Sequence, residues 1–255
     1  MKKLTTNLTL AAALTLALAT LGAGMAHAED AKPAEAKPDN EISYNVALTS
    51  DYRYRAISQS RLKPALQGGA DYTNNPTGLY AGTWLSTIHW IKDAGGDGNV
   101  EWDLYAGKRG EIVKDVSYDV GGLAYVYPSN GLDTNANTFE LYGQVGYGPG
   151  YIKYSHSLTN LFGFADSKNS GYLDAGANID IAEGLVLNLH AGHQKVRGTG
   201  NSVFSYSDYK IGVTKDFGIV SVSLAAIKAD TSAYVAPNGK NLGKTGVVLT
   251  ATKTF

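Results

Sequence analysis

The sequence contains no cysteine and only two methionines, and it has little net charge. Without cysteine, the chain has no disulfide framework, no catalytic thiol and no cysteine-ligated metal site. A formal net charge of -1 indicates neither a nucleic-acid partner nor a strongly charged substrate. Beyond the N-terminal region, no apolar run approaches the roughly 20 residues that a membrane-spanning helix needs. A helical membrane protein is therefore excluded.

The N-terminal region has the pattern of an export signal. Lys2 and Lys3 are followed by an apolar stretch over residues 8–21, and Ala26-His27-Ala28 forms a small-x-small cleavage site. We expect residues 1–28 to be a cleaved signal peptide. Residues 29–40 are polar, contain proline and lack an apolar period, so we expect a disordered periplasmic leader. Residues 41–255 then form the folded domain.

The folded domain is rich in glycine and tyrosine, with 30 and 17 of each in the whole chain. From residue 41 onward, apolar residues recur with the period of two that is typical of strands. Val100, Trp102 and Leu104, for example, alternate with Glu101 and Asp103. The pattern predicts twelve strands, over 42–52, 65–73, 78–89, 99–107, 116–127, 138–147, 151–158, 171–181, 185–194, 207–215, 219–229 and 244–255.

The connections between these strands alternate in length. Short turns occupy 74–77, 148–150, 182–184 and 216–218, with a looser connection over 108–115. Longer polar loops occupy 53–64, 90–98, 128–137, 159–169, 195–206 and 230–243. Transmembrane barrels of the bacterial outer membrane have even strand numbers, short periplasmic turns and longer extracellular loops. The sequence therefore predicts an all-β protein, a single antiparallel up-and-down transmembrane β-barrel with about 12 strands and both termini in the periplasm.

One face of the predicted strands carries many ionisable side chains. They are Asp51, Arg53, Asp71, Glu101, Asp103, Asp119, Glu140, Lys153, Asp174 and Lys210. A dry interior would hold these groups only at a heavy desolvation cost, whereas a hydrated lumen accommodates them. We therefore expect the charged face to line the lumen and the apolar face to contact lipid.

The last predicted strand has the features of an assembly signal for outer-membrane barrels. Val247, Leu249, Ala251 and Phe255 share one face, and Phe255 is a terminal aromatic residue. Lys253 departs from this pattern, because an apolar or aromatic residue is usual at its position. We expect outer-membrane lipid and the insertion machinery of that membrane to be partners of this strand.

Several short sequence segments resemble those of a known family. They include Ser50-Asp51-Tyr52-Arg53-Tyr54-Arg55, Gly78-Leu79-Tyr80-Ala81-Gly82-Thr83-Trp84, Trp102-Asp103-Leu104-Tyr105-Ala106-Gly107 and the closing Lys253-Thr254-Phe255. Together these segments resemble the TorF family of outer-membrane porins, and the resemblance extends from about Ser43 to Phe255. The resemblance implies an outer-membrane barrel with a transport role and does not imply a substrate. Ala56 stands where glycine is expected after the arginine, which affects the first loop.

The inward charges suggest how such a barrel would act. We expect a constriction that selects ions or small polar solutes, lined by Asp51, Arg53, Arg55, Asp71, Glu101, Asp103, Asp119 and Glu140. The same residues could instead form Arg–carboxylate pairs that brace the lumen, and the two interpretations are compatible. The expected process is passive diffusion with no catalytic residue, cofactor or metal.

Two other functions remain open at this point. One is a structural or surface-interaction barrel whose lumen is plugged. The other is a membrane-embedded lipid hydrolase, for which Tyr154-Ser155-His156-Ser157 is the one tempting cluster. We also expect aromatic girdles at the two membrane interfaces, formed by most of a set of seven residues, the alternative being ordinary sheet packing: Tyr44, Trp84, Trp90, Trp102, Tyr125, Tyr147 and Phe217.

Overall fold

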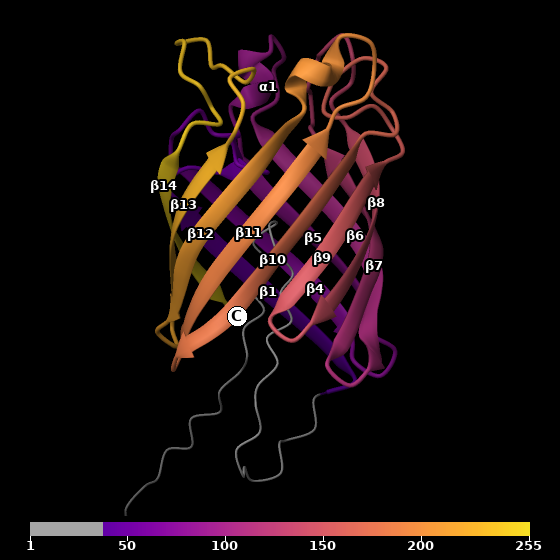
Figure 1. Ribbon diagram of the computed structural model, residues 1–255, viewed down its shortest axis with the longest axis vertical. Coiled ribbons are helices and arrows are strands. Elements are labelled where there is room, and N and C mark those ends of the chain that lie inside the picture. The colour runs from indigo at the N-terminus through magenta and orange to yellow at the C-terminus, as the bar shows by residue number, and fades with distance from the viewer. Residues whose placement is uncertain (1–37) are drawn as a thin grey trace, which may run out of the picture.

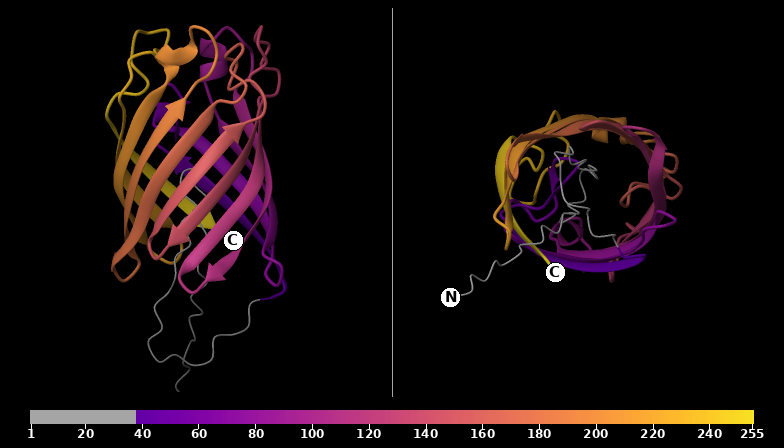
Figure 2. Two further views of the ribbon diagram at one scale, coloured as in Figure 1. Left: turned by 45° about the vertical axis from the view of Figure 1, so that its right-hand side comes forward. Right: turned by 90° about the horizontal axis from the view of Figure 1, so that it is seen from below.

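The structure, a computed structural model, describes residues 38–255 and contains a closed antiparallel β-barrel (Figures 1 and 2). Each strand of the wall pairs with its neighbours in sequence, and β1 pairs with β14 to close the ring. The wall strands are β1 (Asn40–Thr49), β4 (Ala65–Asn74), β5 (Leu79–Thr87), β6 (Val100–Val113), β7 (Val116–Val126), β8 (Thr138–Tyr147), β9 (Gly150–Ser157), β10 (Gly171–Ala182), β11 (Leu185–Lys195), β12 (Tyr206–Asp216), β13 (Ser221–Ala229) and β14 (Gly246–Thr254). The predicted twelve-stranded barrel is confirmed.

The predicted signal peptide and most of the predicted leader lie outside the described residues. The first strand, β1, begins at Asn40, so the end of the expected leader already belongs to the barrel. Within residues 38–255, no helix has the length and apolar character needed to cross a bilayer.

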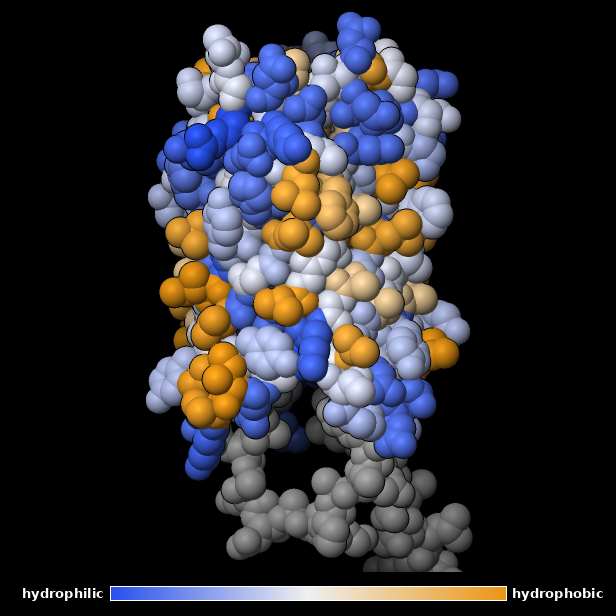
Figure 3. All heavy atoms as spheres, turned by 90° about the vertical axis from the view of Figure 1, so that its right-hand side faces the viewer, coloured by the Kyte–Doolittle hydropathy of each residue, from blue (hydrophilic) through white to orange (hydrophobic). Residues whose placement is uncertain are grey.

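Side-chain burial along the strands separates an outer surface from an interior. In β8, Glu140 and Tyr142 are 1% and 8% exposed, whereas Leu141 and Val145 are 46% and 52% exposed. This alternation follows from the period of two in a strand. Figure 3 shows hydrophobic side chains spread over the middle of one face of the barrel and hydrophilic side chains gathered over the loop end. The outer surface of the wall is therefore apolar.

Long and short connections alternate as predicted, so that all the long ones meet at one end of the barrel (Figure 1). We call this the loop end and the other the turn end. The long connections contain three elements that the sequence pattern did not predict: the hairpin of β2 (Arg53–Tyr54) and β3 (Ile57–Ser58), the helix α1 (Trp90–Asp93) and the 3-10 helix η1 (Asn201–Phe204).

The connection over 108–115 is shorter than predicted. Strand β6 continues to Val113 and leaves only Lys114 and Asp115 before β7, with a register irregularity between Glu111 and Val113. The polar sequence of this segment suggested a loop. Pairing of Arg109 with Asp119 extends the ladder, because side chains at the barrel end can remain in water while the backbone groups pair.

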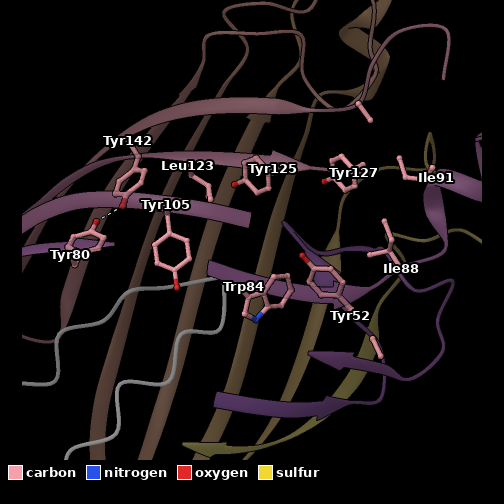
Figure 4. Packing of buried hydrophobic residues seen from close by; sticks show 12 residues of the cluster. Tyr52, Tyr80, Trp84, Ile88, Ile91, Tyr105, Leu123, Tyr125, Tyr127 and Tyr142 are labelled. Carbon is pink, nitrogen blue, oxygen red and sulfur yellow. Dashed lines mark hydrogen bonds between the residues drawn. The ribbon is translucent and has the colours of Figure 1, made fainter. Parts of the chain in front are cut away.

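Aromatic side chains fill much of the interior, from the loop end toward the turn end (Figure 4). The main cluster contains Tyr52, Tyr80, Trp84, Ile88, Ile91, Tyr105, Leu123, Tyr125, Tyr127 and Tyr142, together with two alanines. Glycine makes room for these rings: a Cβ on Gly82 would lie 2.4 Å from the ring of Tyr105. The interior is therefore partly occupied by tyrosine and tryptophan, not by charged groups alone.

The expected aromatic girdles are only partly present. Trp84 and Tyr125 are buried inside the barrel, and Trp90 packs against the interior cluster, so assigning these three to a girdle was wrong. Their strand parity places Trp84 and Tyr125 on the same side as Asp103, to which both are paired. Aromatic character alone does not separate the two faces of a strand. The exposed members of the set are Tyr44, Trp102, Tyr147 and Phe217.

Candidate functional site

The hairpin of β2 and β3 follows β1 and folds into the loop end of the barrel. Its tight turn consists of Arg55 and Ala56, whose φ angles of 45° and 64° are both left-handed. Two-residue hairpin turns with two positive φ angles favour glycine or asparagine. This explains why glycine is expected where Ala56 stands. The turn holds Arg55 at the tip of the hairpin.

Arg55 joins the hairpin to the far wall of the barrel. Its Nη2 lies 2.7 Å from Oε2 of Glu140 on β8, and its Nη1 donates to Oε1 of Glu140 at 3.1 Å and to Oε1 of Gln194 on β11 at 2.6 Å. The guanidinium also stacks over the rings of Tyr54 and Tyr172. Since β8 lies five strands away from β1 in a ring of twelve, this ion pair crosses the lumen.

Arg53 joins the same hairpin to the strands near the end of the chain. Its Nε donates to Oδ2 of Asp51 at 2.7 Å, and its Nη1 donates to the carbonyl of Lys244 at 2.7 Å. The other carboxylate oxygen of Asp51 accepts hydrogen bonds from Ser58 and Ser60. Asp51, Arg53 and Arg55 were predicted to line a constriction, and the structure gives them mutual or cross-barrel partners that fix the hairpin in place.

Two carboxylates of β6 lie beneath this hairpin. Glu101 is 1% exposed and accepts hydrogen bonds from the hydroxyls of Tyr52 at 2.5 Å and Tyr127 at 2.8 Å. Burial, and then the nearby charge of Glu101, raises the pKa of Tyr52 and Tyr127 well above the usual value, so both keep their protons and donate. Asp103 is fully buried, and neither of its carboxylate oxygens has a hydrogen-bond partner among the described residues.

The remaining predicted residues lie closer to the turn end. Asp71 on β4 accepts a hydrogen bond from Tyr105 at 2.6 Å, and Asp119 on β7 accepts one from Tyr80 at 2.5 Å. The guanidinium of Arg109 lies 5.1 Å from the centre of the Tyr80 ring. Asp71 and Asp119 therefore form a second polar region, separate from the Arg55–Glu140 pair.

The sequence analysis placed Asp174 on the lumen face but did not identify the polar cluster that Asp174 forms with His190 and Asp208 on β10 to β12. Nε2 of His190 lies 2.8 Å from Oδ1 of Asp208, and the Tyr172 hydroxyl donates to Oδ2 of Asp208 at 2.8 Å. Nδ1 of His190 lies 3.9 Å from Oδ1 of Asp174. The signal that could have identified the rest of this cluster is the spacing of Asp208 and Lys210. They lie two residues apart on β12, so Asp208 shares the inward face that was assigned to Lys210.

Above the Arg55–Glu140 pair, the loops surround a cavity of about 440 Å³. We call it the vestibule. Its walls come from five of the six long connections and from the loop-end residues of β11 and β12. Aromatic rings dominate the lining, which includes Tyr54, Trp90, Tyr127, Phe162, Phe164, Tyr206 and Tyr234. The vestibule is therefore a recess at the loop end whose base includes Arg55 and Gln194.

The segment considered for hydrolysis lacks a complete set of catalytic partners. His156 contacts the Tyr154 hydroxyl at 3.4 Å and the side-chain oxygen of Asn169 at 3.3 Å. The Ser157 hydroxyl donates to the carbonyl of Thr159. Across residues 38–255, no group of three or more His, Cys, Asp or Glu side chains is arranged to hold a metal ion. The described contacts of His156 therefore include no carboxylate.

The expected assembly residues lie on the outer surface of β14 and just beyond it. Val247, Leu249 and Phe255 are 67%, 50% and 69% exposed, and Ala251 is also exposed. Lys253 extends over the Phe255 ring, with its Nζ 5.6 Å from the ring centre. This placement is compatible with lipid contact.

Comparison with solved structures places the fold among porin barrels. One similar structure is the NanC porin, with a TM-score of 0.57 and 9% sequence identity over 84% of this chain and 99% of that one. Another is the KdgM porin in complex with disordered oligogalacturonate, with a TM-score of 0.54 and 6% identity over 84% and 98% of the two chains. At these identities the likeness concerns the fold. No curated protein matches the sequence.

A family model covers the entire barrel domain and extends slightly beyond its N-terminal end. The matched region is residues 33–255, and the family is described as "Bacterial protein of unknown function (Gcw_chp)". The resemblance to the TorF family stays a prediction, because the description of the matching family does not name TorF. The chain belongs to the Gcw_chp family of bacterial proteins.

Proposed function

We propose that this protein is an outer-membrane porin that admits ions or small polar solutes by passive diffusion. The observation that carries the proposal is the inverted arrangement of the barrel. Strand β8 presents Leu141 and Val145 outward, while Glu140 pairs with Arg55 inside. An apolar exterior suits lipid, and closed strand pairing satisfies every backbone group of a wall in a bilayer. The fold likeness to the NanC and KdgM porins supports the same function.

The proposed mechanism is electrostatic filtering without any covalent step. Polar groups that line a pore replace part of the hydration shell of a passing solute, and their charges decide which solutes pass. The proposed selectivity residues are the eight named from the sequence: Asp51, Arg53, Arg55, Asp71, Glu101, Asp103, Asp119 and Glu140. In this proposal, the hairpin of β2 and β3 sets the narrowest part of the path.

The proposed location is the outer membrane of a Gram-negative bacterium. Support comes from the export-signal pattern of residues 1–28, the alternation of long and short connections, and the exposed aromatic residue Phe255. Export by a cleaved signal peptide and recognition of β14 by the insertion machinery are parts of the same proposal. The expected contacts of the exterior are membrane lipids, and no nucleic acid is involved.

The cross-lumen anchoring of the hairpin favours a second candidate, a closed barrel that acts through its surface loops. The hairpin is fixed to Glu140 and Gln194 on one side and to the carbonyl of Lys244 on another. If this arrangement does not open, solutes cannot pass. Such a barrel would bind a partner through its long loops and would not conduct.

Conductance in planar lipid bilayers tests the first proposal against the second. Purified barrel that is folded, as judged by strand-rich circular dichroism and heat-sensitive migration in gels, should produce discrete steps of current. A folded preparation that inserts into vesicles and never conducts would contradict the porin proposal. A preparation of the same vesicles without protein is the control.

A further inference from the structure

The vestibule combines rigid aromatic walls with polar groups. Its rings pack edge to face: Trp90 against Tyr127 at 5.0 Å, Tyr54 against Phe162 at 5.5 Å, and Tyr206 against Tyr234 at 5.4 Å between ring centres. Edge-to-face packing fixes ring orientation. The volume of about 440 Å³ lies within the range of 300–1,000 Å³ that is typical of small-molecule sites. The recess is therefore large enough for a small solute.

Several polar atoms of the lining have no partner within the described part of the chain. The Tyr206 hydroxyl, the Nε of Arg55 and the Oε1 of Gln59 take part in no hydrogen bond there, and neither do the side chains of Asp133 and Thr134. The set contains both donors and acceptors. A purely apolar ligand would leave these groups unpaired at a cost in affinity, so the lining favours a ligand that carries several hydrogen-bonding groups.

The charges around the vestibule argue against a charged ligand. Of its lining residues, only Arg55 and Asp133 are fully charged at neutral pH. Arg55 is already paired with Glu140, which leaves Asp133 as the uncompensated charge. An anionic ligand would meet Asp133 and would have to compete with Glu140 for Arg55. A cationic ligand would be attracted by the carboxylate of Asp133, but it would lie against the Arg55 guanidinium, which carries the same charge.

We infer that the vestibule binds a neutral saccharide of one or two rings. The C–H faces of a sugar ring suit the aromatic walls, and its hydroxyls both donate to and accept from groups such as Tyr206, Gln59 and Asp133. The inference deepens the proposed function and rests on it, since the bound saccharide is the solute that enters the barrel. The Arg55–Glu140 pair lies at the base of the site, so the sugar is held directly above the narrow part of the proposed path.

Titration of the full-length barrel with maltose tests this inference. Binding is followed by intrinsic tryptophan fluorescence, because Trp90 lies in the lining while Trp84 and Trp102 do not. The Trp90→Phe variant identifies the source of the signal. We expect a saturable change with maltose, and the Tyr206→Phe variant should bind maltose roughly threefold to tenfold more weakly, as expected for the loss of one hydrogen bond.

The matched control is Tyr154→Phe, which removes a hydroxyl from a tyrosine that is 48% exposed on the outer surface. Its maltose affinity should equal that of the unaltered protein. Glucuronate and benzyl alcohol are the competing probes. No saturable change with maltose, or tighter binding of glucuronate or benzyl alcohol than of maltose, would overturn the inference.

Conductance of the same preparations separates this inference from the proposed function. Current steps without maltose binding would contradict the saccharide site and leave the porin proposal standing. Maltose binding in a barrel that never conducts would contradict the porin proposal and, with it, the role of the sugar as a transported solute. Current steps that maltose reduces in the unaltered protein, and reduces less in Tyr206→Phe, would support both.

Discussion

The two halves of the lumen are built differently. At the loop end, Glu101, Asp103 and Glu140 are nearly or completely buried under a hairpin that crosses the barrel. Toward the turn end, Asp119 is also buried, but Asp71 and Lys153 are only half-buried. The wall is continuous over both halves, so strand pairing does not account for the contrast. The first loop accounts for the contrast, because it inserts Arg55 between the walls of the barrel.

The largest expected effect comes from removing the cation at the centre of the loop-end half. In Arg55→Ala, Glu140 remains buried without its ion-pair partner, which we expect to destabilise the closed arrangement by about 3–5 kcal/mol. The hairpin should then leave the lumen more often, and the mean single-channel conductance should rise. Bilayer recordings and thermal unfolding of the same preparation measure both effects.

Arg109→Ala is the matched control in the turn-end half. Arg109 is half-buried and donates to Thr73, so its removal should change stability and conductance much less. Equal effects of the two substitutions would show that the halves do not differ in the way described.

The outer surface should show no such contrast. Leu141 and Val145 lie on the same strand, toward the loop end and the turn end respectively, and both are exposed. Arginine at either position should reduce the free energy of unfolding in lipid vesicles by about 2–4 kcal/mol near the bilayer midplane. Urea-induced unfolding measures this loss. A variant that unfolds like the unaltered protein would indicate that the exterior does not contact lipid.

The loop-end half should also respond to alkaline pH through Tyr52 and Tyr127. Burial and the charge of Glu101 raise the pKa of both hydroxyls. The unfolded chain loses these protons from a pH of about 10, while the folded chain retains them. Their contribution to stability is therefore complete below that pH and is lost as the pH rises above it. Tyr127→Phe should show a smaller alkaline loss of stability, and an unchanged loss would contradict the assignment.

The smallest expected effect concerns the strained turn at Ala56. Glycine adopts the positive φ of 64° more readily than alanine, so Ala56→Gly should stabilise the hairpin by about 1 kcal/mol. Ala47→Gly on β1 is the control and should instead destabilise the barrel by about 0.5–1 kcal/mol, because glycine weakens a regular strand. Thermal unfolding compares the two. A loss of stability in Ala56→Gly would contradict the strain argument.

The barrel could be predicted because its signal is repeated in every strand. The alternation of Phe139 and Leu141 with Glu140, for example, assigns both faces of β8 without any knowledge of distant contacts. The chain order of the strands follows from antiparallel pairing between neighbours. The sequence therefore indicated which residues share the inward face of the strands with Asp103.

The arrangement of the site was not accessible in this way. The contact of Arg55 with Glu140 joins residues that are 85 positions apart, and it depends on a hairpin of two-residue strands that has no recognisable period. Trp84 and Tyr125 were assigned to the exterior because aromatic residues suit both a membrane interface and a packed interior. The vestibule is formed by five connections, whose mutual placement no local pattern encodes.

The most direct test of the inverted barrel uses the absence of native cysteine. Single cysteines replace two neighbours on β11: Asn188, whose side chain bonds to Asn178 inside the barrel, and Leu189, which pairs with the exposed Ile211. In lipid vesicles, a water-soluble thiol reagent should modify the Asn188→Cys variant and leave the Leu189→Cys variant unmodified until the bilayer is dissolved. Modification of Leu189→Cys with protection of Asn188→Cys would contradict a hydrated interior and a lipid-facing exterior.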